Sequence, residues 1–133
     1  MKNVEHIGIA VTSLANSIPL FEALLNTACY KTETVESEAV NTAFFQKGET
    51  KIELLESITE DGVIRKFIDR KGEGIHHIAF KVLDIYTEMA RLKAEGFVLL
   101  NEEPKQGADN KLVCFLHPKT TNSVLIEICQ DRG

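Results

Sequence analysis

The sequence predicts an α+β protein built from two similar modules, each with the order strand, helix and three strands. A histidine near the start of an alternating apolar strand occurs twice, at His6 and at His77, 71 residues apart (77 − 6 = 71). Each of these strands is followed by a helical pattern and then by extended segments. The last extended segment carries Glu53 in the first half and Glu127 in the second. Both halves therefore open with a histidine strand and close with a glutamate strand.

Length and composition fit one globular domain. The chain has 133 residues, of which 44% are hydrophobic and 26% charged, and this is enough for one well-buried core. We therefore predict a single domain over residues 1–133. Its modules are expected at about 1–56 and 74–131, joined by a short helical connector at 57–73.

Charge and hydropathy exclude several classes of partner. The net charge of −5 gives no support to binding of nucleic acid or of an anionic membrane surface. No apolar run approaches the roughly 20 residues of a membrane span, and the N-terminal residues lack the apolar core of a signal peptide. We expect a cytoplasmic protein.

The three cysteines are odd in number and far apart in the chain, at Cys29, Cys114 and Cys129. No two of them form a CxxC pair, so a zinc ribbon or a thioredoxin-type site is not indicated. The pattern predicts reduced, buried thiols and not a disulfide framework.

In the first module we expect a strand at 4–11, a helix and three further extended segments. Apolar residues at helical spacing predict the helix. They are Leu14, Ile18, Phe21 and Leu25. Because a proline inside a helix removes a backbone hydrogen bond, we expect the regular helix to begin near Ser17, which leaves Pro19 in its first turn. The extended segments are expected at 29–35, 40–46 and 50–55.

In the second module we expect a strand at 72–82, then a helix that Asp84 caps and Gly96 ends. An extended segment is expected to begin at 97–100 and a loop to cover 101–110. The strands expected after this loop are 111–116 and 124–129, separated by a turn at 117–119. The connector between the modules is expected to hold a short amphipathic helix between Gly62 and Gly72.

The repeated histidines and glutamates predict a metal site. If the strands of both modules line one curved sheet, four side chains meet on it. They are His6, Glu53, His77 and Glu127. Imidazole and carboxylate ligands together favour manganese, iron, cobalt, nickel or zinc over calcium. A single strand histidine is more often structural than a ligand, but the matching order in two modules favours the metal site. His76 has the opposite parity in its strand, and we interpret it as structural or supporting.

Two small residues, Gly8 and Ala79, follow the histidines by two positions each and share their faces. A large side chain at either position would fill the space beside the histidine. This pattern is typical of a cleft that admits a small molecule.

Five stretches of the sequence resemble the vicinal oxygen chelate superfamily and, within it, the methylmalonyl-CoA epimerase family. They are residues 6–11, 51–55, 72–80, 115–119 and 124–127. The most specific parts are His-His-Ile-Ala-Phe, which begins at His76, and Phe-Leu-His-Pro-Lys, which begins at Phe115. The resemblance covers about residues 4–130.

The resemblance implies an eight-stranded open cup around a divalent ion, commonly cobalt or manganese, with zinc or nickel as alternatives. The ligands of the family fall on His6, Glu53, His77 and Glu127. The implied activity interconverts (2R)- and (2S)-methylmalonyl-CoA, in propionate metabolism, by proton transfer at C2 through a metal-stabilised enolate. Glu127 would act as both ligand and general base. A homodimer and a small CoA thioester substrate are also implied.

The second acid/base group of the family is not matched in this sequence. By the resemblance it would fall near Thr42, whose hydroxyl cannot perform proton transfer of this kind. Glu36, Glu38 and Glu53 are the alternatives. No coenzyme A motif is readable, and Lys119 and the basic residues of the connector are the candidates for contacts with its phosphates.

Two other functions fit the same fold. Glyoxalase I shares the ligand types and also moves a proton through a metal-stabilised intermediate. A metal-free protein of this fold that sequesters a small molecule is the alternative that is not an enzyme, although that class commonly lacks the histidine and glutamate set.

Overall fold

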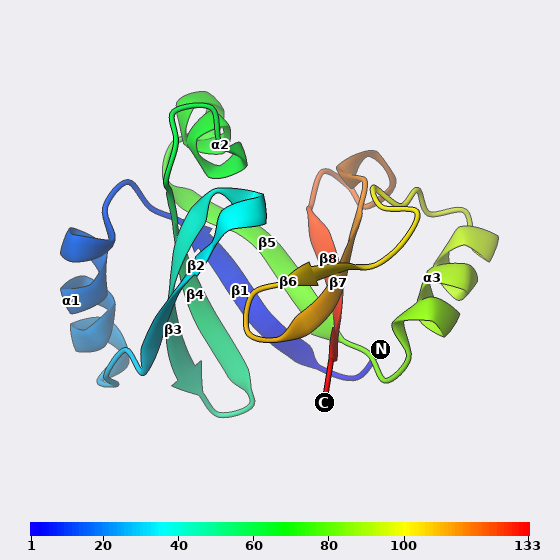
Figure 1. Cartoon of the computed structure of the whole chain (residues 1–133), viewed down its shortest axis with the longest axis horizontal. Coiled ribbons are helices and arrows are strands. Elements are labelled where there is room, and N and C mark those ends of the chain that lie inside the picture. The colour runs from blue at the N-terminus through cyan, green and yellow to red at the C-terminus, as the bar shows by residue number, and fades with distance from the viewer. The chain divides into compact units, whose positions relative to one another are not determined.

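The computed structural model describes all 133 residues, Met1–Gly133, and they form two compact units. One unit is His6–His76, and the other combines Met1–Glu5 with His77–Gly133. Apart from the start of its first strand, each predicted module lies within one unit (Figure 1).

The first unit has the predicted order of strand, helix and three strands, followed by the connector helix. Its elements are β1 (Val4–Ala10), which begins in the other unit, α1 (Leu14–Leu25), β2 (Lys31–Val35), β3 (Val40–Lys47), β4 (Thr50–Ser57) and α2 (Val63–Lys71). A 3₁₀ turn at Glu36–Glu38 joins β2 to β3. The strand order is β2-β3-β4-β1, with β1 parallel to β4 and the other pairs antiparallel.

The second unit repeats this topology. Its elements are β5 (Gly74–Lys81), which begins at the end of the first unit, α3 (Ile85–Ala94), β6 (Lys105–Gly107), β7 (Lys111–Leu116) and β8 (Ile126–Asp131). The strand order is β5-β8-β7-β6, with β5 parallel to β8 and the other pairs antiparallel. The predicted α+β class, with eight strands in two tandem βαβββ modules, is confirmed.

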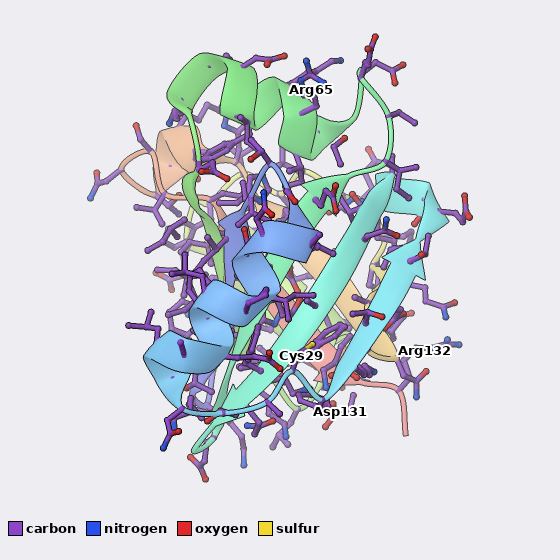
Figure 2. All side chains as sticks on the ribbon, turned by 90° about the vertical axis from the view of Figure 1, so that its left-hand side faces the viewer. Cys29, Arg65, Asp131 and Arg132 are labelled. Atoms are coloured by element: carbon purple, nitrogen blue, oxygen red, sulfur yellow. The ribbon has the colours of Figure 1, made fainter.

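Helices cover the sheet of the first unit on both faces. On one face α1 packs through Leu14 against Ala43, Phe45 and Leu54. On the other face Ile64 of α2 packs in a separate apolar cluster. The buried partners of Ile64 in that cluster are Ala10, Val40 and Leu55. Figure 2 shows α1 lying across the sheet, Arg65 on α2, and Cys29 in the segment that leads from α1 into β2.

In the second unit α3 covers one face of the sheet and packs on buried residues of β7 and β8. The core on this face consists of Val82, Ile85, Met89, Leu92, Cys114, Leu116 and Ile128. The opposite face carries a smaller cluster of Ala79, Val113 and Cys129. None of the three cysteines forms a disulfide, as predicted, but only Cys114 and Cys129 are buried, whereas Cys29 is half-buried. None of the helices is both long enough and apolar enough to cross a membrane.

The predicted start of the first helix near Ser17 is wrong, because α1 begins three residues earlier at Leu14. Ser13 caps the helix, since its side-chain oxygen accepts a hydrogen bond of 3.2 Å from the backbone nitrogen of Asn16. Pro19 therefore lies inside the helix. Both Pro19 and Ala15 are exposed, so water can reach the carbonyl oxygen that the proline leaves without an N–H donor.

The second strand of the second module is also displaced from its prediction. Residues 97–100 form only an isolated bridge, Leu99 to Leu116, whereas β6 lies within the expected loop. Gly107 permits this pairing, because a Cβ atom there would come within 2.9 Å of Val113. The final strand begins at Ile126, two residues later than predicted.

The predicted positions of three glycines at helix ends are confirmed. The connector helix α2 lies between Gly62 and Gly72, and Gly72 has a φ of 82°. Gly96, with a φ of 98°, follows the last residues of α3. The assignment of the whole chain to a single domain stays a prediction.

A buried lysine forms a charge cluster in the second unit. Lys111 is 8% exposed, and its Nζ lies 3.7 Å from Oε2 of Glu5 and donates a hydrogen bond to Asp131. Asp131, labelled in Figure 2, also forms an ion pair of 3.3 Å with Lys81. The hydrogen bond from Lys111, reinforced by Lys81, holds the pKa of Asp131 below its ordinary value of 3.8.

Replacing Asp84 should destabilise the protein, because its carboxylate accepts hydrogen bonds of 3.1 and 3.2 Å from the backbone nitrogens of Tyr86 and Thr87. We expect Asp84→Ala to lower the free energy of unfolding by about 1 kcal/mol in a urea titration. Asp84→Asn retains a capping oxygen and should stay close to the wild type. Equal losses in both variants would contradict the capping role.

Replacing Asp131 should have a small effect that depends on pH. Since the pKa of Asp131 is lowered in the folded protein, its stabilisation is present above pH 3.8 and is lost as the pH falls through the folded value. Asp131→Asn should lower Tm slightly at pH 7, because the side chain is half exposed and screened by solvent. The difference from the wild type should disappear in strong acid. Asp61→Asn, in an exposed loop, is the matched control, and a difference independent of pH would contradict this role.

Candidate active site

The first unit brings His6 and Glu53 together. Because β1 and β4 are parallel and Gly8 lies opposite Glu53, His6 occupies the next position on the same face of the sheet. Nδ1 of His6 lies 3.2 Å from Oε2 of Glu53. Each residue is 4% exposed. Because Gly8 has no side chain, the imidazole and the carboxylate are left in direct contact.

The second unit brings His77 and Glu127 together in the same way. The strands β5 and β8 are parallel, and Ala79 lies opposite Glu127. Nε2 of His77 lies 3.2 Å from Oε1 of Glu127. The two residues are 6% and 5% exposed. The structure thus pairs the four predicted site residues two by two, one pair in each unit.

A phenylalanine lies beside each pair. Phe44 of β3 is directly opposite Glu53, and Phe115 of β7 is directly opposite Glu127. The ring of Phe115 meets the imidazole of His77 edge to face, with 5.7 Å between the ring centroids. Neither phenylalanine is among the site residues predicted from the sequence. They could have been found, because Phe44 and Phe115 are separated by the same 71 residues as the two histidines (115 − 44 = 71).

A lysine lies over each of these phenylalanine rings. Nζ of Lys31, on β2, is 4.8 Å from the centroid of Phe44. Nζ of Lys105, on β6, is 5.7 Å from the centroid of Phe115. These distances are typical of cation–π contacts. The repeat therefore includes one lysine, one phenylalanine, one glutamate and one histidine from the four strands of each module.

The chemistry of the paired side chains fits a divalent metal. Buried charges in proteins are normally paired or bound to metal ions, and a neutral imidazole with a carboxylate is a common set of ligands for transition metals.

The remaining predicted residues lie outside these contacts. Thr42 is 1% exposed, and its hydroxyl has no hydrogen-bond partner. Glu36 and Glu38 lie in the 3₁₀ turn before β3, where Glu36 is exposed and Glu38 half-buried. Lys119 is exposed in the turn after β7.

His76 has a packing role. Its ring meets the ring of Phe67 on α2 edge to face, with a centroid distance of 5.0 Å. This contact agrees with the interpretation of His76 as a structural residue, on the opposite face of β5 from His77.

Known proteins resemble this chain in sequence and in fold. Residues 5–115 match the model of the glyoxalase/bleomycin resistance protein/dioxygenase superfamily. The uncharacterised protein YqjC of Bacillus subtilis (strain 168) is 40% identical over all of this chain and 95% of its own length. The mitochondrial methylmalonyl-CoA epimerase of Dictyostelium discoideum is 34% identical over 94% of this chain and 76% of its own length.

A solved structure shares the whole fold. A variant of Streptomyces coelicolor methylmalonyl-CoA epimerase, in complex with 2-nitronate-propionyl-CoA, superimposes with a TM-score of 0.94 at 29% identity. The superposition covers 100% of this chain and 99% of that one. The chain therefore belongs to the glyoxalase/bleomycin resistance protein/dioxygenase superfamily, and its predicted resemblance to the methylmalonyl-CoA epimerases within it is confirmed.

Proposed function

We propose that this protein is an enzyme that interconverts (2R)- and (2S)-methylmalonyl-CoA by moving the proton at C2. The observation that carries this proposal is the buried His–Glu pair at the same place in both modules, with 3.2 Å between partners in each. The relatives named methylmalonyl-CoA epimerase, one of them solved with a CoA thioester analogue, support the choice of substrate.

We propose further that the two pairs together bind one divalent ion. Its ligands would be His6, Glu53, His77 and Glu127. Their donor set suits cobalt or manganese, and also zinc or nickel. When bound, such an ion would act as a Lewis acid and stabilise the enolate oxygen that develops as the C2 proton leaves.

The chain's own residues would then perform the proton transfer. We assign the general base to Glu127, because a carboxylate is a suitable acceptor for the C2 proton and His77 orients it at 3.2 Å. The ring of Phe115 lies on the strand directly opposite Glu127 and contributes an apolar, water-excluding surface. A low local dielectric of this kind strengthens the electrostatic interactions within the site.

Delivery of a proton to the other face of C2 requires a second group. The three alternatives differ in their surroundings. Glu53 is buried beside His6, Glu38 is half-buried, and Glu36 is exposed. Glu53 is related to Glu127 by the internal repeat, and Glu38 is the more sheltered of the two glutamates in the turn before β3.

Metal binding tests the ligand assignment. Wild-type protein stripped of metal should take up one Co²⁺ per chain in isothermal titration, and His77→Ala should lose most of this affinity. His76→Ala changes the adjacent residue on the opposite face of β5 and should keep it. Two ions per chain, or none, would contradict the single site.

Deuterium exchange tests the reaction. Wild-type protein with Co²⁺ and methylmalonyl-CoA in D₂O should remove the C2 proton signal in NMR far faster than a chelated control. Glu127→Gln should slow this exchange by about 10²- to 10⁴-fold, because it removes the base. Its cobalt content should be measured alongside, to separate loss of the base from loss of the ion.

If the wild type exchanges no faster than the chelated control, the epimerase proposal fails. The glutathione adduct of methylglyoxal is then the next substrate, since turnover of that adduct would identify the glyoxalase I activity.

A further inference from the structure

Thr42 is the one buried side chain whose polar atom lacks a hydrogen-bond partner. It is 1% exposed, so solvent does not satisfy the hydroxyl. Most buried side-chain polar atoms in proteins have a partner, and each exception calls for an explanation. The position of Thr42 in its strand and its burial together indicate which group can become the partner of the hydroxyl.

Thr42 lies on the same face of the first sheet as Glu53. In the register of β3 and β4, Phe44 is opposite Glu53 and Thr42 is opposite Leu55. Since alternate residues of a strand share a face, Thr42 is the diagonal neighbour of Glu53, one strand across and two residues along. Diagonal neighbours are within reach of long side chains such as glutamate.

Because Thr42 is buried, we look for the hydrogen-bond partner of its hydroxyl among the groups of the protein itself. A substrate group approaching from solvent cannot reach a hydroxyl whose residue is 1% exposed. The carboxylate of Glu53 is itself buried and can reach the hydroxyl from the same face. In the structure Oε2 of Glu53 is instead directed at Nδ1 of His6, at 3.2 Å.

We propose that Thr42 is a positioning residue for Glu53 in the metal-bound protein. An ion bound by His6 and Glu53 replaces their direct contact, and the Glu53 carboxylate then accepts a hydrogen bond from the Thr42 hydroxyl. A carboxylate has lone pairs for both interactions. Partners that hold a ligating carboxylate in this way commonly change metal affinity by 10- to 100-fold when they are removed. This inference rests on the proposed metal site.

The proposal predicts opposite effects on the metal-free and metal-bound protein. Thr42→Val keeps the shape of the side chain and removes the hydroxyl. Because that hydroxyl has no partner in the structure, Thr42→Val without metal should have an equal or higher Tm than the wild type without metal. Its Kd for Co²⁺ should rise by about 10-fold or more, since the bound state alone loses a hydrogen bond.

The experiment titrates Co²⁺ into metal-free wild type, Thr42→Val, Thr42→Ser and Thr32→Val, with Tm measured with and without the ion. The visible spectrum of bound Co²⁺ should change in Thr42→Val, because it reports the geometry of the ligands. Thr42→Ser keeps the hydroxyl and should restore the affinity and the spectrum. Thr32→Val, at an exposed position on β2, makes the same chemical change away from the site and should leave both unchanged.

Two results would overturn the role of Thr42 while leaving the metal site in place. One is an unchanged Kd and spectrum in Thr42→Val. The other is a lower Tm for Thr42→Val than for the wild type when both lack Co²⁺. That result would show that the hydroxyl already has a partner without the ion. If the wild type itself binds no Co²⁺, the proposed metal site fails, and the role of Thr42 fails with it.

Discussion

Parallel pairing of the first and last strands of each module is the constraint on which the candidate site depends. In both modules the first strand contributes a histidine and the fourth a glutamate, and a parallel register with a small residue opposite the glutamate brings the two into contact. A shift of one residue in either register would turn the glutamate to the face covered by α1 in the first unit or by α3 in the second. The apolar clusters beneath α1 and α3 specify the register, because they require the opposite parity.

The sequence predicted the module order and the four paired residues because both depend on local periodicity and on a repeat within the chain. The roles of Asp84 and Gly72 at helix ends were predicted for the same local reason. Few residue types favour an N-cap position or a positive φ, so both can be recognised from residue type. The start of α1 was mispredicted because the rule on proline was given more weight than the Ser13 cap. The solvent exposure of Pro19, which decides the matter, is a tertiary property.

The other misses depend on contacts between strands. The β6 strand is three residues long, too short to show periodicity, and it forms because Gly107 fits against Val113. The unpartnered hydroxyl of Thr42 cannot be read from a sequence at all, since it depends on what every neighbouring side chain does. The pairing of Phe44 and Phe115 with the glutamates was available from the repeat and was missed. A homodimer and a cytoplasmic location stay predictions.

The boundary between the two units runs through β1, between Glu5 and His6. Glu5 contacts Lys111, and the backbones of Lys2 and Asn3 exchange hydrogen bonds with Lys81. The second unit is therefore assembled from two separate pieces of the chain. A gene cut in the connector would not give two independent half-proteins, because the C-terminal fragment would lack five residues that complete its own fold. The internal repeat is visible in the sequence, but the second unit draws on both ends of the chain.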